Sequence, residues 1–199
     1  MRQRPTTRAF LRPFLAGWFL LQAAAAVAPE DLRGREIFMF SDPRTHTGWT
    51  VERLAHCRED DHGSARIDAG GLLVFEGRLT TPGAVPAVRL EGPGRDLQWR
   101  SLNGLELRVW GDGGIYTVLL HGITHPEEVR YEAAFSTRLN RWTTVFLPFS
   151  DFQPRLHGRI IRNWPRLDLS RLDRLSLQPG RQSPGSFLLK IRWIVARGP

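Results

Sequence analysis

The chain has 199 residues, 41% of them hydrophobic, a length and composition that suit a single domain with a substantial core. The formal net charge is +8, but residues 1–28 contribute four arginines and no acid, and the remaining 24 basic and 20 acidic residues form no basic stripe that would indicate a nucleic-acid partner. The only cysteine is Cys57, which excludes an intrachain disulfide.

The first 28 residues are typical of a targeting segment. A start rich in arginine precedes an apolar run over residues 14–28, which ends in Ala-Val-Ala, a small-x-small cleavage pattern. The run is shorter than the ~20 residues of a membrane-spanning helix. We therefore predict an export signal over residues 1–28, before a single domain over residues 29–199. A mitochondrial presequence and an uncleaved membrane anchor are the rival interpretations.

Short strands are expected over most of the first half of the domain. Residues 37–40 form a short apolar run that suits an edge strand, and another strand is expected to start near Trp49. Alternation of apolar and polar residues then predicts strands at 63–68 and 73–78, and a further strand at 85–90, in which Pro86 indicates an edge or a bulge.

Two polar segments of the chain carry potential metal ligands. Imidazole, thiolate and carboxylate groups all bind divalent ions, but the spacing in residues 54–66 matches no standard motif, so a solvated loop is expected there. A second exposed loop is expected at 121–128. We predict no metal or cofactor. The ligand types in the first segment are His56, Cys57, Glu59, Asp60, Asp61 and His62, and those in the second include His121 and His125.

The centre of the chain carries a strong strand pattern in residues 104–120. Leu105, Leu107 and Val109 alternate with polar neighbours or Trp110, then glycines interrupt the run at 111–114, and a second alternating strand follows. Because Asp-Gly is a strong hairpin signal between two such runs, we predict a β-hairpin in which Asp112 bonds its own turn.

The second half continues with alternating runs at 131–136, 142–147 and 187–195, and a shorter one around Leu175 and Leu177. Both faces of 142–147 are largely apolar, which predicts a strand deep in a sandwich. Asp151 is expected to cap a short helical turn, and residues 154–170 to form a long polar connection. The rings expected in the core are Trp110, Trp142 and Trp193.

About ten short strands and no convincing amphipathic helix predict an all-β fold, a sandwich of jelly-roll type. A set of positions occurs in a characteristic order: Gly111, Asp112, Gly113, Tyr116, Trp142, Leu147, Pro148, Phe149, Asp151, Phe152, Gly158 and Arg159. With these positions, about residues 73–194 resemble the complex I intermediate-associated protein family. The resemblance implies a galactose-binding-like jelly roll and, for mitochondrial members, a non-enzymatic role in assembling respiratory complex I (NADH:ubiquinone oxidoreductase).

Two segments depart from the family pattern. After Trp49 the chain reads TVERLAHCREDDHG where the family has an Asn-Asp-Gly-Val-Met-Gly-Gly type of segment, and residues 82–88 replace a Gly-Gly-Phe segment. If those segments touch a partner in the family, the partner here differs. An export signal is also inconsistent with a mitochondrial assembly role. The fold inference is less affected, because function depends on sites rather than on folds.

The chain contains no nucleophile elbow, phosphate loop or dinucleotide fingerprint, so we expect no enzyme. The first functional hypothesis is a protein-binding assembly module whose partners are respiratory-chain subunits. The alternative is an exported carbohydrate-binding sandwich, which requires at least two Trp or Tyr rings exposed together on one concave face or loop rim. A membrane is expected to be contacted only through the N-terminal segment.

Overall fold

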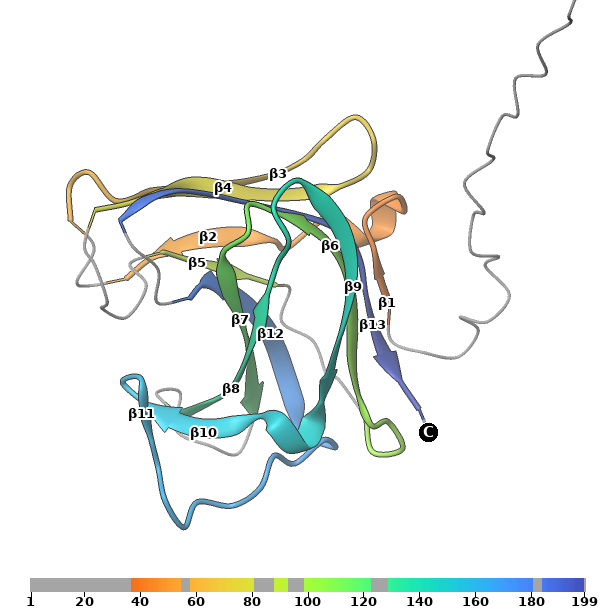
Figure 1. Cartoon of the computed structure of the whole chain (residues 1–199). Helices are drawn as coiled ribbons and strands as arrows, with labels where there is room; N and C mark the ends of the chain where they lie inside the picture. Colours follow the sequence, from red (N-terminus) through yellow and green to blue (C-terminus); the bar gives the residue numbers. More distant parts are fainter. Residues whose placement is uncertain are drawn as a thin grey trace, which may run out of the picture. The chain divides into compact units, whose positions relative to one another are not determined.

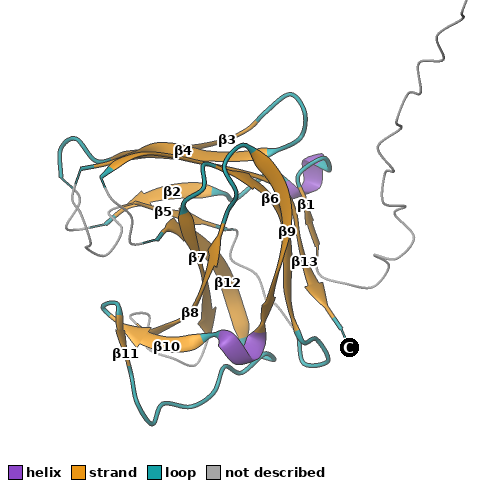
Figure 2. Cartoon of the chain, in the orientation of Figure 1, coloured by secondary structure: helices purple, strands orange, loops and turns teal. Residues whose placement is uncertain are grey.

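The computed structural model describes residues 37–54, 58–80, 88–92, 99–122, 129–180 and 184–198. Two antiparallel sheets pack face to face in this part of the chain, and helix is limited to two three-residue turns, Pro43–Thr45 and Phe149–Asp151 (Figures 1 and 2). The all-β sandwich predicted from the alternation is confirmed. None of the helices in the described ranges is long and apolar enough to cross a membrane.

The first sheet, sheet A, has the strand order β3-β4-β13-β6-β9, and β1 pairs with the later part of β13. The long strand β13 therefore lies in the middle of the sheet, whereas β3 and β9 are its edges. The bounds are β1 Ile37–Met39, β3 His62–Ile67, β4 Leu73–Leu79, β6 Gly104–Gly111, β9 Arg141–Pro148 and β13 Gly185–Arg197.

The second sheet, sheet B, has the order β11-β10-β8-β7-β12-β5-β2. Its two ends, β2 with β5 and β10 with β11, extend to the same side of β7 and β12, so its outward face is concave (Figure 1). The bounds are β2 Thr50–Arg53, β5 Val88–Glu91, β7 Ile115–Gly122, β8 Val129–Ser136, β10 Gln153–Leu156, β11 Arg159–Ile160 and β12 Leu172–Pro179.

The core fills the space between the sheets with the inward residues of each alternating strand. Aromatic pairs close its two ends, since Trp49 meets Phe38 and Phe40 edge to face, and Phe149 stacks on the buried Trp99 at a centroid distance of 5.7 Å. The inward aliphatic residues include Leu90, Leu105, Leu107, Val109, Val118, Leu120, Leu175, Leu177, Leu189 and Ile191.

The predicted central hairpin is wrong. Strand β6 pairs with β13 and β9 in sheet A, whereas β7 pairs with β12 and β8 in sheet B. The glycine-rich link at 111–114 therefore carries the chain from one sheet to the other. It is tight enough that a Cβ on Gly111 would lie 2.4 Å from Thr137 Cβ, and Gly113 has a φ of 88°. Glycine signals a sharp change of direction, but it does not determine which strand the chain pairs with next.

The Asp112 carboxylate accepts a hydrogen bond within the link at 111–114, as predicted, and it also connects the two sheets. Its Oδ1 accepts from Gly114 N at 2.9 Å, and its Oδ2 accepts from both the Tyr116 hydroxyl and Leu188 N, each at 2.9 Å. Tyr116 belongs to sheet B and Leu188 to sheet A. Burial, together with the Asp112 charge, raises the pKa of Tyr116, so the phenol keeps the proton that it donates.

Strand β9 lies at an edge of sheet A rather than deep in the sandwich, because its only described strand partner is β6. Its outward side chains are therefore open, and Phe146 is 48% exposed. The cap predicted for Asp151 is also wrong. This residue lies inside the turn Phe149–Asp151, Pro148 occupies the N-cap position, and the exposed carboxylate accepts a bond from Ser150 Oγ at 3.2 Å.

The three tryptophans expected in the core lie instead on the outward face of sheet A, each half-buried. Trp110 and Trp142 are cross-strand partners and alternate with inward residues of β6 and β9. Trp193 pairs with Arg108 after a register shift between Ile191 and Trp193, which moves it to the outward side. A bulge of this kind interrupts the strict alternation that placed Trp193 with the core residues of β13.

The remaining strand predictions agree closely with the structure. The runs at 37–40, 63–68, 73–78, 131–136, 175–177 and 187–195 all coincide with strands. The run at 85–90 is strand β5 from Val88 onward, and Pro86 lies outside the described residues. The connection expected at 154–170 is shorter, because residues 153–160 form the β10–β11 hairpin.

Candidate functional site

The outward residues of sheet B form the strongest candidate site, which we call the concave face. Each alternates with a core residue on its own strand, so the side chains lie on the side away from sheet A. Most are polar or charged, and several are nonetheless buried. They are Glu52, Arg89, Glu91, Thr117, Leu119, His121, Arg130, Glu132, Gln153, Arg155, Arg174, Ser176 and Gln178.

A buried hydrogen-bonded chain connects three strands of this face. Ser176 Oγ donates to Glu91 Oε2 at 2.6 Å, and His121 Nε2 lies 3.0 Å from Ser176 Oγ. The single serine proton is used on Glu91, so His121 Nε2 must carry a proton and donate to Ser176. The histidine Nδ1 is then the acceptor nitrogen of the neutral ring. Only β5, β12 and β7 held side by side can assemble this chain.

Charged groups of both signs surround the hydrogen-bonded chain of Glu91, Ser176 and His121. Arg89, only 2% exposed, has its Nη1 atom 3.2 Å from Glu52 Oε2 and 3.3 Å from Glu91 Oε1. Burial lowers the pKa of His121 to about 4, so the ring is neutral at pH 7. For Glu91, burial opposes ionisation, but the Ser176 hydrogen bond and the neighbouring arginines outweigh it and lower the pKa.

The concave face also has hydrogen-bonding atoms that are buried and unused. Arg89 Nε, Arg130 Nε and Gln178 Oε1 have no hydrogen-bond partner among the residues that the structure describes. Arg130 forms no salt bridge with an acid in the described ranges, and burial together with the Arg89 charge lowers its pKa. Buried polar groups are normally paired, so two donors and one acceptor without partners indicate a place for a ligand's own polar groups.

The family-matching residues lie elsewhere and mainly build the fold. Those at 111–113 form the link between the sheets, and Tyr116 is the buried residue bonded to Asp112. Phe149 and Phe152 pack in the core with ring centroids 6.0 Å apart. Trp142 and Pro148 belong to the edge strand β9. None of these residues is part of the concave face.

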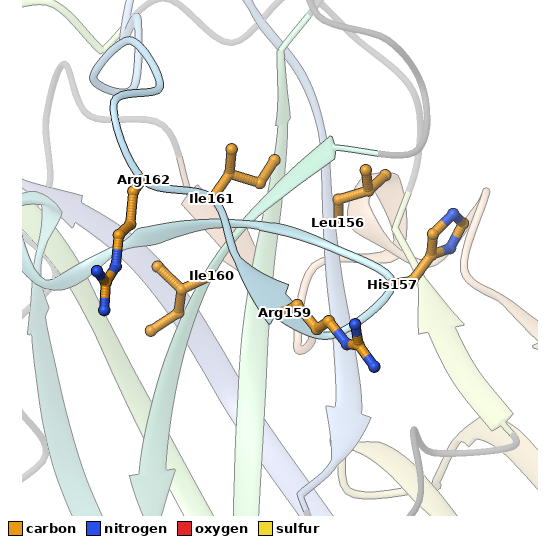
Figure 3. A pocket seen from close by; sticks show the side chains of 6 residues that line it. All are labelled: Leu156, His157, Arg159, Ile160, Ile161 and Arg162. Carbon is orange, nitrogen blue, oxygen red and sulfur yellow. The ribbon is translucent and has the colours of Figure 1, made fainter.

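Gly158 and Arg159, the last of the matching positions, are in the β10–β11 hairpin. Gly158 has a φ of 77° and its carbonyl accepts a 2.8 Å bond from Arg155 Nη1. A shallow pocket lies beside them, and the exposed Ile160 and Arg159 point out around it (Figure 3). Its lining is Leu156, His157, Arg159, Ile160, Ile161 and Arg162. The whole lining comes from residues 156–162 and includes no buried polar group.

The two polar segments differ from the loops expected for them. His56, Cys57 and His125 lie outside the described residues. Asp61 is 1% exposed, and its carboxylate accepts from Arg58 N, Thr80 N and Thr80 Oγ1, so it holds the chain before β3 rather than facing solvent. His121 lies in strand β7. No group of three metal-binding side chains occurs in the part of the chain that the structure describes.

Sequence reasoning did not find Arg89, Glu91, Arg130, Ser176 or Gln178 as site residues. The alternation itself contained the signal, since Leu-Ser-Leu-Gln at 175–178 places a serine and a glutamine on one side of a strand. Such residues are normally solvated. Only the pairing of β12 with β5 and β7 shows that they meet other polar groups on a curved face.

Solved structures with the same fold support the architecture. The family 11 carbohydrate-binding module of the cellulosomal cellulase Lic26A-Cel5E of Clostridium thermocellum superposes with a TM-score of 0.56 at 14% identity, over 83% of this chain and 95% of the module. The module from Clostridium thermocellum in complex with a β-1,3-1,4-mixed-linked tetrasaccharide gives 0.54 at 16% identity, over 81% of this chain and 95% of that one. The chain thus has a fold similar to these carbohydrate-binding-module jelly rolls.

The comparison with curated proteins returned no relative. The sequence profile of complex I intermediate-associated protein 30 matches residues 55–191, which include the link between the sheets, the edge strand β9, the β10–β11 hairpin and the concave face from β5 to β12. That match spans more than half of the chain and confirms the resemblance found in the motifs. The chain therefore belongs to the complex I intermediate-associated protein 30 family.

Proposed function

We propose that this protein is a non-enzymatic binding module of the assembly-factor type, which binds an acidic segment of a protein partner on its concave face. One observation carries the proposal. The face has a rigid buried polar chain, from Glu91 through Ser176 to His121, beside unused hydrogen-bonding atoms on Arg89 and Arg130. A carboxylate is the group that an unused guanidinium donor pairs with best.

Family membership supports a protein as the partner, and the respiratory-chain subunits of complex I are the first candidates. The balance of charge agrees, since Arg89, Arg130, Arg155 and Arg174 face three glutamates on the concave face. Glu91 is shared between Arg89 and Arg174, and Glu132 pairs with Arg155 at 3.6 Å, so the surplus positive charge lies at Arg130. An acidic residue of a partner would complete this side of the face.

The Glu91, Ser176 and His121 set is better suited to binding than to catalysis. In a hydrolase triad the histidine accepts the serine proton, which activates the oxygen. Here Ser176 donates to Glu91, and His121 donates to Ser176. His121 is therefore not positioned to remove the hydroxyl proton, Glu91 is a weak base because its pKa is lowered, and the hydroxyl is fully buried. We propose that the set fixes the shape of the face.

The alternative function is an exported carbohydrate-binding module. Its main requirement is at least two Trp or Tyr rings exposed together on one concave face or loop rim, and the outward positions of sheet B in the described ranges carry no such ring. The half-buried Trp110 and Trp142 lie on sheet A. The alternative predicts binding in a screen of neutral oligosaccharides, including mixed-linked β-glucan. It also predicts that the exported fraction contains a mature protein whose intact mass corresponds to a chain starting near Pro29.

The proposal is tested by crosslinking the tagged full-length chain in cells and identifying the captured proteins by mass spectrometry. We expect respiratory-chain subunits, and we expect Arg130→Gln to reduce their recovery about tenfold by removing the unused guanidinium. Arg78→Gln, at an exposed arginine of strand β4 in sheet A, is the control and should recover them normally. Capture of no such subunit, together with glycan binding, would favour the alternative.

A further inference from the structure

The four edges of the two sheets differ in how well they are protected against pairing with another strand. Exposed edges are normally kept short or carry charged residues. Strand β11 has two residues, β2 has four and ends in Glu52 and Arg53, and β3 has six and includes Arg66. Strand β9 is the longest of the four, with eight residues, and has no charged residue after Arg141.

The unprotected edge of β9 is also accessible. The sequence Trp-Thr-Thr-Val-Phe-Leu is rich in the β-branched and aromatic residues that favour strands. Thr144 and Phe146 are exposed, and Trp142 is half-buried. Strand β6 pairs with one side of β9, and no strand in the described ranges pairs with the other side. Figure 1 shows β9 at this end of sheet A.

The first half of β9 lies among uncompensated positive charges. The guanidinium carbons of Arg192 and Arg108 lie 5.3 and 6.0 Å from the centre of the Trp142 ring, and Arg108 Nη1 also donates to Thr144 Oγ1 at 3.0 Å. Arg138 and Arg141 are exposed nearby in sequence. None of these four arginines forms a salt bridge with an acid in the described part of the chain.

We propose that the free edge of β9 binds an extended segment of a partner protein as an added strand, with acidic side chains opposite the Arg108 and Arg192 end. Main-chain hydrogen bonds would supply affinity and the arginines would select for charge. A second copy fits less well. Its β9, paired antiparallel, would bring Phe146 and Leu147 beside these arginines and offer no carboxylate. The inference rests on the proposed function only in taking a protein as the partner, and it uses another surface.

The test uses the full chain and a ten-residue peptide of alternating valine and glutamate, with amide hydrogen exchange as the readout. We expect the peptide to slow exchange over residues 142–147 and to leave the other edge of sheet A, residues 62–67, unchanged. A matched peptide with lysine in place of glutamate should protect far less. A valine-glutamate peptide N-methylated at every residue, which has no main-chain N–H donor along either edge, should not protect at all.

A charge reversal on the protein provides the second arm. Arg192 is exposed on the bulge of β13, so Arg192→Glu should leave the fold intact and weaken binding of the glutamate peptide about tenfold. Arg78→Glu, at an exposed arginine of β4 that β13 and β6 separate from β9, should not. Three results would overturn the inference: no slowing of exchange in β9 at millimolar peptide, equal protection by the lysine peptide, or β9 amides already protected in a dimer of the free protein. None of these depends on recovery of respiratory subunits.

Discussion

The two sheets use the same alternation of residues, but their outward faces are stabilised in different ways. On sheet A, cations lie over indole rings at the surface, with Lys190 Nζ 4.9 Å from the centre of the Trp110 ring and Arg192 over Trp142. On sheet B, charged groups are drawn into a connected network, in which Ser176 is fully buried between Glu91 and His121.

This difference determines how each face tolerates change. A cation over an exposed ring contributes little and can be replaced locally, because solvent takes over the lost contact. In a buried polar network water cannot replace a lost hydrogen bond, because each member that loses its partner stays desolvated. We therefore expect substitutions on the outward face of sheet B to cause large losses of stability, and substitutions on the outward face of sheet A to cause small ones.

The sharpest test makes the same substitution on both faces. Glu91→Ala should lower the free energy of unfolding by about 3 kcal/mol or more, because it leaves the buried Arg89 short of a partner and Ser176 without its acceptor. Glu106→Ala on sheet A, which removes only a partly exposed pair with Arg197, should lower it by about 1 kcal/mol or less. Denaturant unfolding at pH 7 measures both, and equal losses would show that the faces do not differ in this way.

The buried His121 on sheet B should make the stability of the protein depend on pH. His121 has a pKa of about 4 in the folded protein and about 6.5 when unfolded, so the unfolded chain takes up the proton first as the pH falls. Its contribution is complete above about pH 6.5 and is lost between there and pH 4, by about 2 to 3 kcal/mol. The lowered pKa of Glu91 adds a further loss at lower pH, as its carboxylate takes up a proton.

His121→Gln should flatten the pH dependence between pH 7 and pH 5, and His62→Gln, at an exposed histidine in β3, should leave its slope unchanged. Urea unfolding at half-unit pH steps is the measurement. The same slope in the wild type and in His121→Gln would show that the buried imidazole does not control acid stability.

The smallest expected effect lies on sheet A. Lys190→Gln should cost about 0.5 to 1 kcal/mol, because it removes the ammonium group over Trp110. For a domain of this size that is a fall of about 1 to 4 °C in the melting temperature. Lys190→Arg keeps a cation over the ring and should retain most of the stability. A loss as large as that for Glu91→Ala would contradict the tolerance assigned to this face.

The sequence was sufficient to predict most strands, because alternation is a local property of the chain. Strands such as β6 and β8 follow it closely. Their partners could not be predicted in the same way. The link at 111–114 has the composition of a hairpin turn yet joins two sheets, and the largely apolar β9 lies at an edge. Pairing depends on contacts between residues that are distant in sequence.

The candidate site was harder to predict than the fold. A polar residue facing outward from a strand normally faces water, so nothing in the alternation distinguishes Ser176 or Gln178 from a solvated position. Their burial follows from the curvature of sheet B and from long neighbouring side chains such as Arg89. The resemblance to the family did identify membership, but its matching residues mark the fold rather than the concave face.

The position of β13 in sheet A has a consequence for biosynthesis. This strand lies between β4 and β6 and also pairs with β1, although it is the last of the described strands to leave the ribosome. Until residues 185–197 are available, sheet A is divided into three pieces, β1, β3-β4 and β6-β9, with open edges at β4 and β6. Sheet A therefore cannot be completed until β13 has left the ribosome, and up to that point the nascent chain exposes strand edges that are prone to aggregation.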